Sequence, residues 1–158
     1  MKRILIYISF IYSISFSNIA FSQIKTYHFD QLDSLNKINK KNIVIFIHTE
    51  WCKYCDQMTN ITFKNNDIIK ILNNNFYFID FNAENMNQIN YNGHSFDFKP
   101  SGFNTGVHQL AKNLGSINGK LNYPTITILN KKNEIIFQNS GLMKSKELFA
   151  VLNEAVKN

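Results

Sequence analysis

The chain has 158 residues, 44% of them hydrophobic and 18% charged, which is enough for one globular domain and too few for two. This composition excludes disorder as the main state. Residues 23–158 contain 15 Lys, no Arg and 11 acidic residues, a net charge of +4, and the Lys residues are scattered among Asp and Glu. Because binding to a phosphate backbone needs clustered positive charge, nucleic acid is not expected as a partner.

The N-terminal segment has the pattern of an export signal. Lys2 and Arg3 precede an apolar run over residues 4–16, and the small residues Ala20 and Ser22 lie where a signal peptidase cuts. We therefore predict a signal peptide over residues 1–22 and a mature chain that is periplasmic or otherwise exported. The alternative is an uncleaved membrane anchor, since this apolar segment is nearly long enough to cross a bilayer.

The rest of the sequence has an α/β pattern, with one domain over residues 23–158. Apolar residues at helical spacing predict helices over 29–40, from the cysteine pair to about residue 60, and over 144–156. A short helix is expected to start at Asp67, which is the predicted N-cap. β-branched and aromatic runs predict strands over residues 43–47, 76–81, 123–129 and 135–138. The last two strands are close enough in sequence to form an antiparallel hairpin.

Residues 83–105 interrupt this alternation and are interpreted as an insertion. Apolar and polar residues alternate over 89–98 around Asn92-Gly93, a strong hairpin signal. A helix capped by Thr105 is predicted to follow, with Gly115 just past its end. The aromatic residues of the insertion form either a partner-docking surface or a small satellite core. They are Tyr91, Phe96, Phe98 and Phe103.

The candidate catalytic motif is Trp51-Cys52-Lys53-Tyr54-Cys55, located where a buried strand gives way to a helix. Backbone N–H groups at the start of a helix and the neighbouring Lys53 stabilise a thiolate at Cys52, which makes it the predicted nucleophile. Cys55 lies three residues on, on the same helical face, and is the predicted resolving thiol that attacks the mixed disulfide.

Two other uses of the cysteine pair remain open. A structural disulfide is one, although a bridge across two residues closes a very small loop and constrains the unfolded chain little. A copper or zinc carrier is the other, with the pair and one of His48, His94 and His108 as ligands, although no histidine follows Cys55 at the spacing of a zinc finger.

The sequence resembles the thioredoxin superfamily over residues 29–158. The resemblance rests on a hydrophobic strand before Thr-Glu-Trp-Cys-x-x-Cys, a second strand, Tyr123-Pro124-Thr125 before an antiparallel pair, and a final helix. Residues 51–63 are most similar to exported thioredoxin-like proteins akin to the terminal domain of transmembrane disulfide reductases. The family implies a three-layer α/β/α fold with a central mixed sheet, here with an inserted hairpin. It also implies that Pro124 is a cis-proline facing the cysteines, and that Trp51 and Tyr123 help to shape a substrate groove.

The sequence departs from this family beside the cysteines. Many thioredoxins carry a buried Asp six residues before the first cysteine, where this chain has Phe46. Asp80, in the adjacent predicted strand, stands where many relatives have Lys. We predict that Asp80 transfers a proton to and from Cys55; alternatively, it faces solvent or pairs with a Lys. His48 is expected to be a strand-end residue near the site.

Together these observations predict a monomeric thiol:disulfide oxidoreductase that exchanges disulfides with the thiols and disulfides of proteins, as a reductase by resemblance. Neither a cofactor nor a resident metal is expected, and the sequence has no nucleotide-binding signature and no second cysteine pair. Electrons are then expected to come from a membrane redox partner. A docking domain that no longer uses its redox motif is a further alternative.

Overall fold

The structure, a computed structural model, describes residues 23–103 and 105–157, so the predicted signal peptide over residues 1–22 lies outside the described residues. Its centre is a four-stranded sheet in the order β2-β1-β7-β8. The strands are β1 (Asn42–His48), β2 (Phe76–Asn82), β7 (Thr125–Leu129) and β8 (Ile135–Ser140). β1 is parallel to β2 and antiparallel to β7, and β7 is antiparallel to β8. The predicted mixed sheet and its C-terminal hairpin are confirmed.

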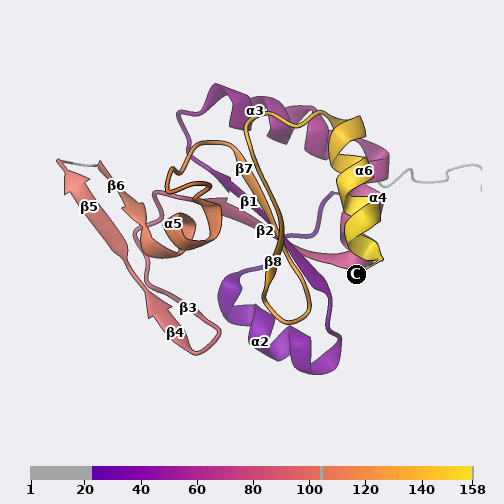
Figure 1. The fold of residues 1–158 in the computed structure, drawn as a ribbon, viewed down its shortest axis with the longest axis horizontal. Coiled ribbons are helices and arrows are strands. Elements are labelled where there is room, and N and C mark those ends of the chain that lie inside the picture. The colour runs from indigo at the N-terminus through magenta and orange to yellow at the C-terminus, as the bar shows by residue number, and fades with distance from the viewer. Residues whose placement is uncertain (1–22, 104, 158) are drawn as a thin grey trace, which may run out of the picture.

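Helices cover both faces of this sheet (Figure 1). One face packs against α2 (Phe29–Ile38) and α5 (Gln109–Gly115). The other packs against α3 (Lys53–Asn60), α4 (Asn66–Asn75) and α6 (Ser145–Val156), with a short 3-10 turn η1 (Thr62–Lys64) between α3 and α4. The predicted three-layer α/β/α architecture is therefore confirmed. Across residues 23–103 and 105–157, none of the helices combines the length and apolar character that crossing a membrane requires.

The central strand β1 explains the uninterrupted apolar run in the sequence. Val44 and Phe46 point to the layer of α3, α4 and α6, whereas Ile43, Ile45 and Ile47 point to the layer of α2 and α5. All five side chains are at most 1% exposed. Because alternate residues of a strand face opposite sides, a strand covered on both faces must be apolar at every position.

The start of α4 differs from the prediction by two residues. Asn65, not Asp67, is the N-cap: the Asn65 side-chain oxygen accepts the backbone N–H groups of Asp67 and Ile68 at 3.0 and 3.3 Å. Asn and Asp are similarly good N-caps, so residue type alone does not show which of the two positions starts the helix. With the cap at Asn65, Ile68 is the third residue of α4, and its side chain is fully buried.

The predicted hairpin of the insertion is confirmed. β3 (Ile89–Tyr91) and β4 (His94–Phe96) are antiparallel and joined by Asn92 and Gly93, both with positive φ, of 51° and 75°. Left-handed conformations at both turn residues match the right-handed twist of the strands. Tyr91 is buried, with its ring 5.2 Å from that of Phe29 in α2. This hairpin therefore belongs to the core on the α2 face.

The next segment contradicts the sequence prediction. A second hairpin, β5 (Phe98–Gly102) and β6 (Thr105–His108), stands where a helix capped by Thr105 was expected, and α5 begins only at Gln109. The insertion thus holds two hairpins and extends to His108. The local capping signal fails because residues 105–108 pair with β5. Close packing holds this pair, since a Cβ on Gly106 would lie 2.3 Å from the ring of Phe98. Phe103, between the two strands, is 94% exposed.

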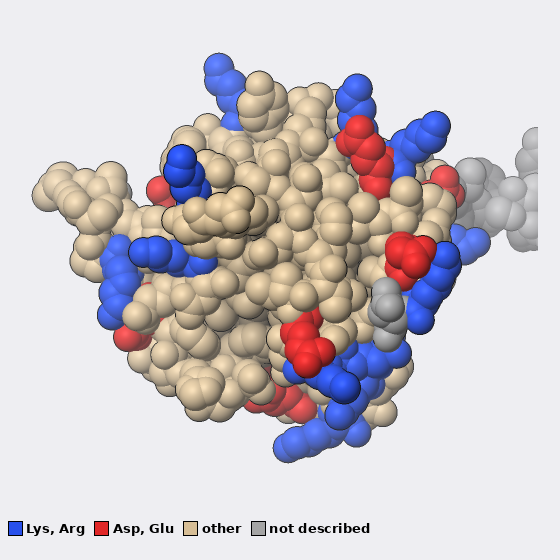
Figure 2. Space-filling model, in the orientation of Figure 1, with Lys and Arg blue, Asp and Glu red and all other residues tan. Residues whose placement is uncertain are grey.

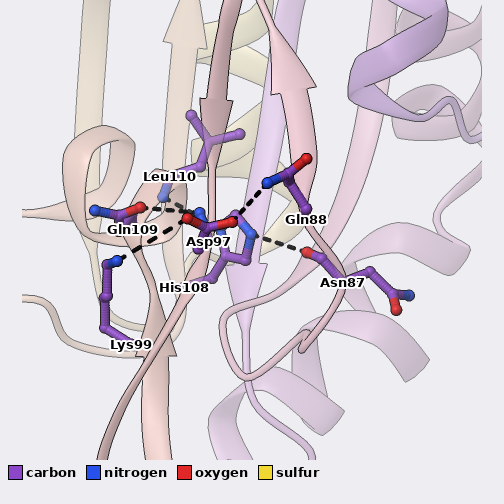
Figure 3. Close-up of polar contacts among 7 residues, drawn as sticks. All are labelled: Asn87, Gln88, Asp97, Lys99, His108, Gln109 and Leu110. Carbon is purple, nitrogen blue, oxygen red and sulfur yellow. Dashed lines mark hydrogen bonds and ion pairs between the residues drawn. The ribbon is translucent and has the colours of Figure 1, made fainter.

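His108 fixes the insertion to the domain (Figure 3). Its side chain is fully buried, and Nδ1 accepts the backbone N–H of Leu110 at 3.1 Å, which caps α5. Nδ1 is then unprotonated, so Nε2 carries the proton and donates to the carbonyl of Asn87 at 3.1 Å. Burial lowers the pKa of His108, and the carbonyl of Asn87 and the charge of Asp97 offset part of this effect.

We expect this histidine to make the protein less stable in mild acid. The folded state has the lower pKa, so the unfolded chain takes up the proton first, and stability falls as the pH drops below the ordinary value of 6.5. Urea unfolding between pH 7.5 and 5 should show this slope. A His108→Asn protein keeps a cap acceptor but cannot titrate, so its slope should be shallower, whereas His94→Asn, at an exposed position in β4, should keep the wild-type slope.

Candidate active site

The cysteine pair lies at the start of α3, directly after the turn that follows β1. Cys52 is the N-cap of α3, and its sulfur accepts the backbone N–H of Cys55 at 3.1 Å. The two cysteines form a disulfide, with their Cα atoms 5.2 Å apart. Both cysteines are buried, with exposed fractions of 7% for Cys52 and 3% for Cys55.

This placement suits thiol chemistry at Cys52. In the reduced protein, a sulfur that accepts an N–H at a helix N-terminus is stabilised as the thiolate, which is the form that attacks disulfides. Lys53, in the first turn of α3, adds an exposed positive charge. Cys55 is within bonding distance of Cys52, as the disulfide demonstrates, and can therefore displace a partner bound to Cys52.

An aromatic rim lies beside the cysteine pair. The indole of Trp51 is 67% exposed and meets the half-buried ring of Tyr123 edge to face, with centroids 5.8 Å apart. The indole N–H of Trp51 donates to Oε1 of Glu84 at 3.1 Å. Burial raises the pKa of Tyr123, and the negative charge of Glu84 raises it further. The structure thus brings Trp51 and Tyr123 into contact and places Glu84 beside Trp51.

Glu84 was missed because nothing in its sequence context distinguishes it. It lies in the turn after β2, where its N–H donates to the side chain of Asn82 at 2.9 Å. The neighbouring Ala83 extends the sheet edge, with its N–H bonded to the carbonyl of His48 at 2.8 Å. Only this tertiary pairing carries Glu84 to the turn that contains Trp51, so no local motif reveals it.

We expect Glu84 to hold Trp51 in place. In a Glu84→Ala protein the indole loses its acceptor, so KM for a protein disulfide should rise about two- to fivefold, the equivalent of about 0.5–1 kcal/mol for one exposed hydrogen bond. A Glu84→Gln protein keeps an oxygen acceptor and should retain most of the affinity. Loss of the charge should also lower the pKa of Tyr123 in both variants, which ultraviolet titration measures. An unchanged Tyr123 titration in both variants would contradict this arrangement.

Pro124 lies at the entrance to β7, next to Tyr123. The Tyr123–Pro124 peptide bond is cis. Pro124 is buried, and its carbonyl accepts the N–H of Gly141, beyond the end of β8, at 2.8 Å. Trp51 and the Tyr123–Pro124 segment are therefore neighbours through the ring contact between Trp51 and Tyr123.

Asp80 pairs with a histidine rather than with a Lys or with solvent alone. Its carboxylate lies 2.8 Å from Nε2 of His48, and both side chains are partly exposed. Asp80 stands opposite Phe46 in the parallel register of β1 and β2. Phe46 belongs to the core cluster that contains both cysteines, so Asp80 and His48 lie on the sheet face that carries α3. The sequence indicated His48 only as a strand-end residue and a candidate metal ligand, because its pairing with Asp80 depends on strand register.

The other candidate metal ligands are dispersed in the structure. His108 is buried in the contacts described above, His48 pairs with Asp80, and His94 lies in β4. Among residues 23–103 and 105–157, no group of three or more His, Cys, Asp or Glu side chains is arranged to hold a metal ion.

Comparison with known proteins agrees with this architecture. A family model described as a thioredoxin-like domain matches residues 29–156. No curated protein sequence matches the chain. Among solved structures, an oxidoreductase named DsbH is similar at 14% identity and a TM-score of 0.57, with 89% of each chain covered. A thioredoxin from Thermus thermophilus has 16% identity and a TM-score of 0.58, covering 84% of this chain and 86% of its own.

A third solved structure with a similar fold is a DsbD domain. The oxidised C-terminal domain of DsbD from Neisseria meningitidis has 15% identity and a TM-score of 0.53, and the match covers 80% of this chain and 90% of that one. At these identities the likeness is one of fold. The family model covers most of the described residues and includes the cysteine pair. The chain therefore belongs to the thioredoxin-like family and is a thiol:disulfide oxidoreductase.

Proposed function

We propose that this protein is an exported, monomeric oxidoreductase that reduces disulfides of other proteins. The observation that carries the proposal is the sulfur of Cys52, held at the N-terminus of α3 by the N–H of Cys55 and bordered by an exposed aromatic rim. A buried resolving thiol beside a nearly buried nucleophile favours transfer to a partner that docks on this rim. The similarity of fold to a protein named an oxidoreductase supports the same class of chemistry.

The proposed reaction proceeds in two exchange steps. The Cys52 thiolate attacks one sulfur of a substrate disulfide, forms a mixed disulfide with it, and releases the other substrate sulfur as a thiolate that takes up a proton. Cys55 then loses its proton and attacks Sγ of Cys52, which closes the Cys52–Cys55 disulfide and releases the second substrate thiol. Two electrons pass from the pair to the substrate. A membrane redox partner re-reduces the pair by the reverse exchange.

Trp51, Tyr123 and Pro124 are proposed to bind the substrate segment that carries the disulfide. Trp51 offers exposed apolar area next to Cys52, and Tyr123 supports it from the side. The peptide groups at Pro124 precede β7, so an extended substrate segment can align with this part of the backbone by strand-like hydrogen bonds. Aromatic side chains are common anchors of protein interfaces.

Asp80 is proposed to exchange the proton of Cys55, together with His48. The support is the 2.8 Å contact between Oδ1 of Asp80 and Nε2 of His48, which lies on the sheet face that carries the cysteines. Asp80 also lines a pocket of about 540 Å³ with Phe46 and with Thr59 of α3. Asp80→Asn should slow closure of the Cys52–Cys55 disulfide and change its pH dependence. An unchanged profile would remove Asp80 from the mechanism.

The direction of electron flow is tested by the reduction potential of the cysteine pair against glutathione. A reductase should have a reduction potential of about −270 mV, the value of thioredoxin, whereas a strong oxidant has a reduction potential of about −120 mV. The purified protein should also reduce insulin disulfides when supplied with an external reductant. A potential near the oxidant value would overturn the assignment as a reductase.

Export is proposed from the signal pattern over residues 1–22, and the similarity of fold to a DsbD domain is compatible with it. When the full chain is expressed in a bacterium with an intact export pathway, the protein recovered from the periplasm should have the mass of a chain that begins at Gln23. Recovery of the uncleaved chain in the membrane fraction would instead support the anchor.

A further inference from the structure

A pocket separate from the cysteine pair lies between the second inserted hairpin and α5. It has a volume of about 580 Å³. Its lining includes Lys99 and Val107 of this hairpin, Gln109 and Lys112 of α5, and Leu121 after α5. The β5–β6 hairpin projects from the body of the domain (Figure 1). We refer to this pocket below as the arm pocket.

The charge of the arm pocket is one-sided. Lys99 of β5 and Lys112 of α5 both line it, and none of the described residues that line it is acidic. Lys99 has a carboxylate beside it, since Oδ2 of Asp97 lies 4.0 Å from Nζ of Lys99. Asp97 already accepts a hydrogen bond of 2.9 Å from Gln88, as Figure 3 shows. Blue Lys side chains are visible beside the projecting hairpin in Figure 2. Lys112 therefore faces the pocket without a carboxylate partner along its wall.

The pocket also contains polar groups suited to a carboxylate. The hydroxyl oxygen of Ser116, another lining residue, is buried and makes no hydrogen bond with the described residues. Gln109 lies on the same wall as Lys112, and its side-chain oxygen accepts the N–H of Asp97. That bond leaves the amide N–H₂ group of Gln109 to serve as a donor. Two ammonium groups, a hydroxyl and an amide together match an anion with oxygen acceptors.

The arm pocket is close to the redox site. Its wall residue Leu121 is two residues from Tyr123, which places their Cα atoms at most about 7 Å apart. The ring of Tyr123 in turn contacts Trp51, next to Cys52. At the base of the hairpin, the N–H of His108 bonds to the carbonyl of Ala83 at 2.8 Å, one residue from Glu84. An extended segment of four to six residues is about 13–22 Å long, and the proposal requires the two sites to lie within that reach.

We propose that the arm pocket binds the carboxylate of an Asp or Glu in the polypeptide whose disulfide is exchanged at Cys52. The proposal rests on the proposed function and specifies its substrates: proteins with an acidic residue about four to six positions from the reacting cysteine. The acidic side chain enters between the β5–β6 hairpin and α5, where Lys99, Lys112 and Ser116 surround it. The hairpin is suited to this as a fixed wall, since Gly106 packs directly against Phe98.

The test uses two synthetic peptides that differ at one position. Each has a cysteine in mixed disulfide with β-mercaptoethanol, and either Glu or Gln five residues from that cysteine. At low ionic strength the reduced protein should react about three to ten times faster with the Glu peptide, the combined effect of two exposed charge contacts. The preference should shrink in 0.5 M salt, because salt screens exposed charges.

Variants identify the pocket as the source of the preference. A Lys99→Gln, Lys112→Gln double variant should react equally with both peptides. The matched control is Lys70→Gln, Lys146→Gln, which removes the same charge from α4 and α6 on the opposite face of the sheet and should keep the preference. Ser116→Ala should weaken the preference without lowering the melting temperature of the free protein, since the hydroxyl has no bond to lose within the described residues.

A binding measurement separates this proposal from the redox proposal. Fluorescence anisotropy with a Cys52→Ser, Cys55→Ser protein should show tighter binding of the Glu peptide, again dependent on Lys99 and Lys112. If binding shows this preference but no peptide disulfide is reduced by the wild-type protein, the proposed reaction fails and the pocket assignment stands. If the Glu and Gln peptides bind equally, or if the double variant keeps the preference, the pocket assignment is wrong.

Discussion

A Cys55→Ser protein is expected to accumulate as a stable mixed disulfide with its substrate, whereas a Cys52→Ser protein should exchange no faster than the reaction without protein. The difference follows from position. Cys52 is the N-cap of α3, where the N–H of Cys55 stabilises its thiolate, and it has the larger exposed fraction of the two. Cys55, 3% exposed, acts only on a sulfur already bound to Cys52. Non-reducing electrophoresis and mass spectrometry of the reaction with a protein disulfide measure both outcomes.

Alkylation provides the control for this pair of variants. In the fully reduced wild-type protein, iodoacetamide at neutral pH should modify Cys52 quickly and Cys55 slowly, and each single variant should retain the behaviour of its remaining cysteine. An inert Cys52 would contradict its role as the nucleophile. A Cys52→Ser protein with full exchange activity would instead support a domain that does not use its redox motif.

The parts of the site that follow from local sequence could be predicted. The apolar run of β1 specifies a strand covered on both faces, and the helical spacing after Cys52 specifies α3. Together they place the cysteine pair at a strand-to-helix junction. The apolar periodicity of a helix or strand is carried by residues within one element, so a single sequence carries enough information to recognise it.

The parts of the site that depend on pairing between distant segments could not be predicted. The contact between His48 and Asp80 requires the parallel register of β1 with β2, and Glu84 reaches Trp51 only because Ala83 extends that pairing. Register joins residues more than 30 positions apart, and one sequence does not show which residues of two strands stand opposite each other.

The second inserted hairpin shows the same limit in another form. Thr105 has the residue type of a cap and is followed by a helical pattern, yet residues 105–108 pair with β5 and His108 caps α5 instead. Histidine is not among the residues usually favoured as N-caps. His108 is held in the capping position by its full burial and by the hydrogen bond of Nε2 to the carbonyl of Asn87. Neither feature can be recognised without the tertiary structure.

The departure at position 46 leads to a large expected effect on stability. Phe46 stands where many relatives carry a buried Asp, and it is 1% exposed. The centroid of its ring is 4.8 Å from that of Phe63 and 5.1 Å from that of His48, on which it stacks. Phe46→Ala should lower the free energy of unfolding by about 3–5 kcal/mol, a large part of the about 5–15 kcal/mol typical of a domain. Phe46→Leu should cost less, because it retains more of the volume.

Urea unfolding of the reduced and oxidised protein measures this cost, with Ile38→Ala as the control. Ile38 is 87% exposed at the end of α2, so its truncation should change stability by at most about 0.5 kcal/mol. Because Phe46 also supports the ring of His48, its removal should slow closure of the Cys52–Cys55 disulfide if His48 and Asp80 move the proton of Cys55. A Phe46→Ala protein that closes the disulfide at the wild-type rate, while still folded, would show that proton transfer does not depend on a fixed His48.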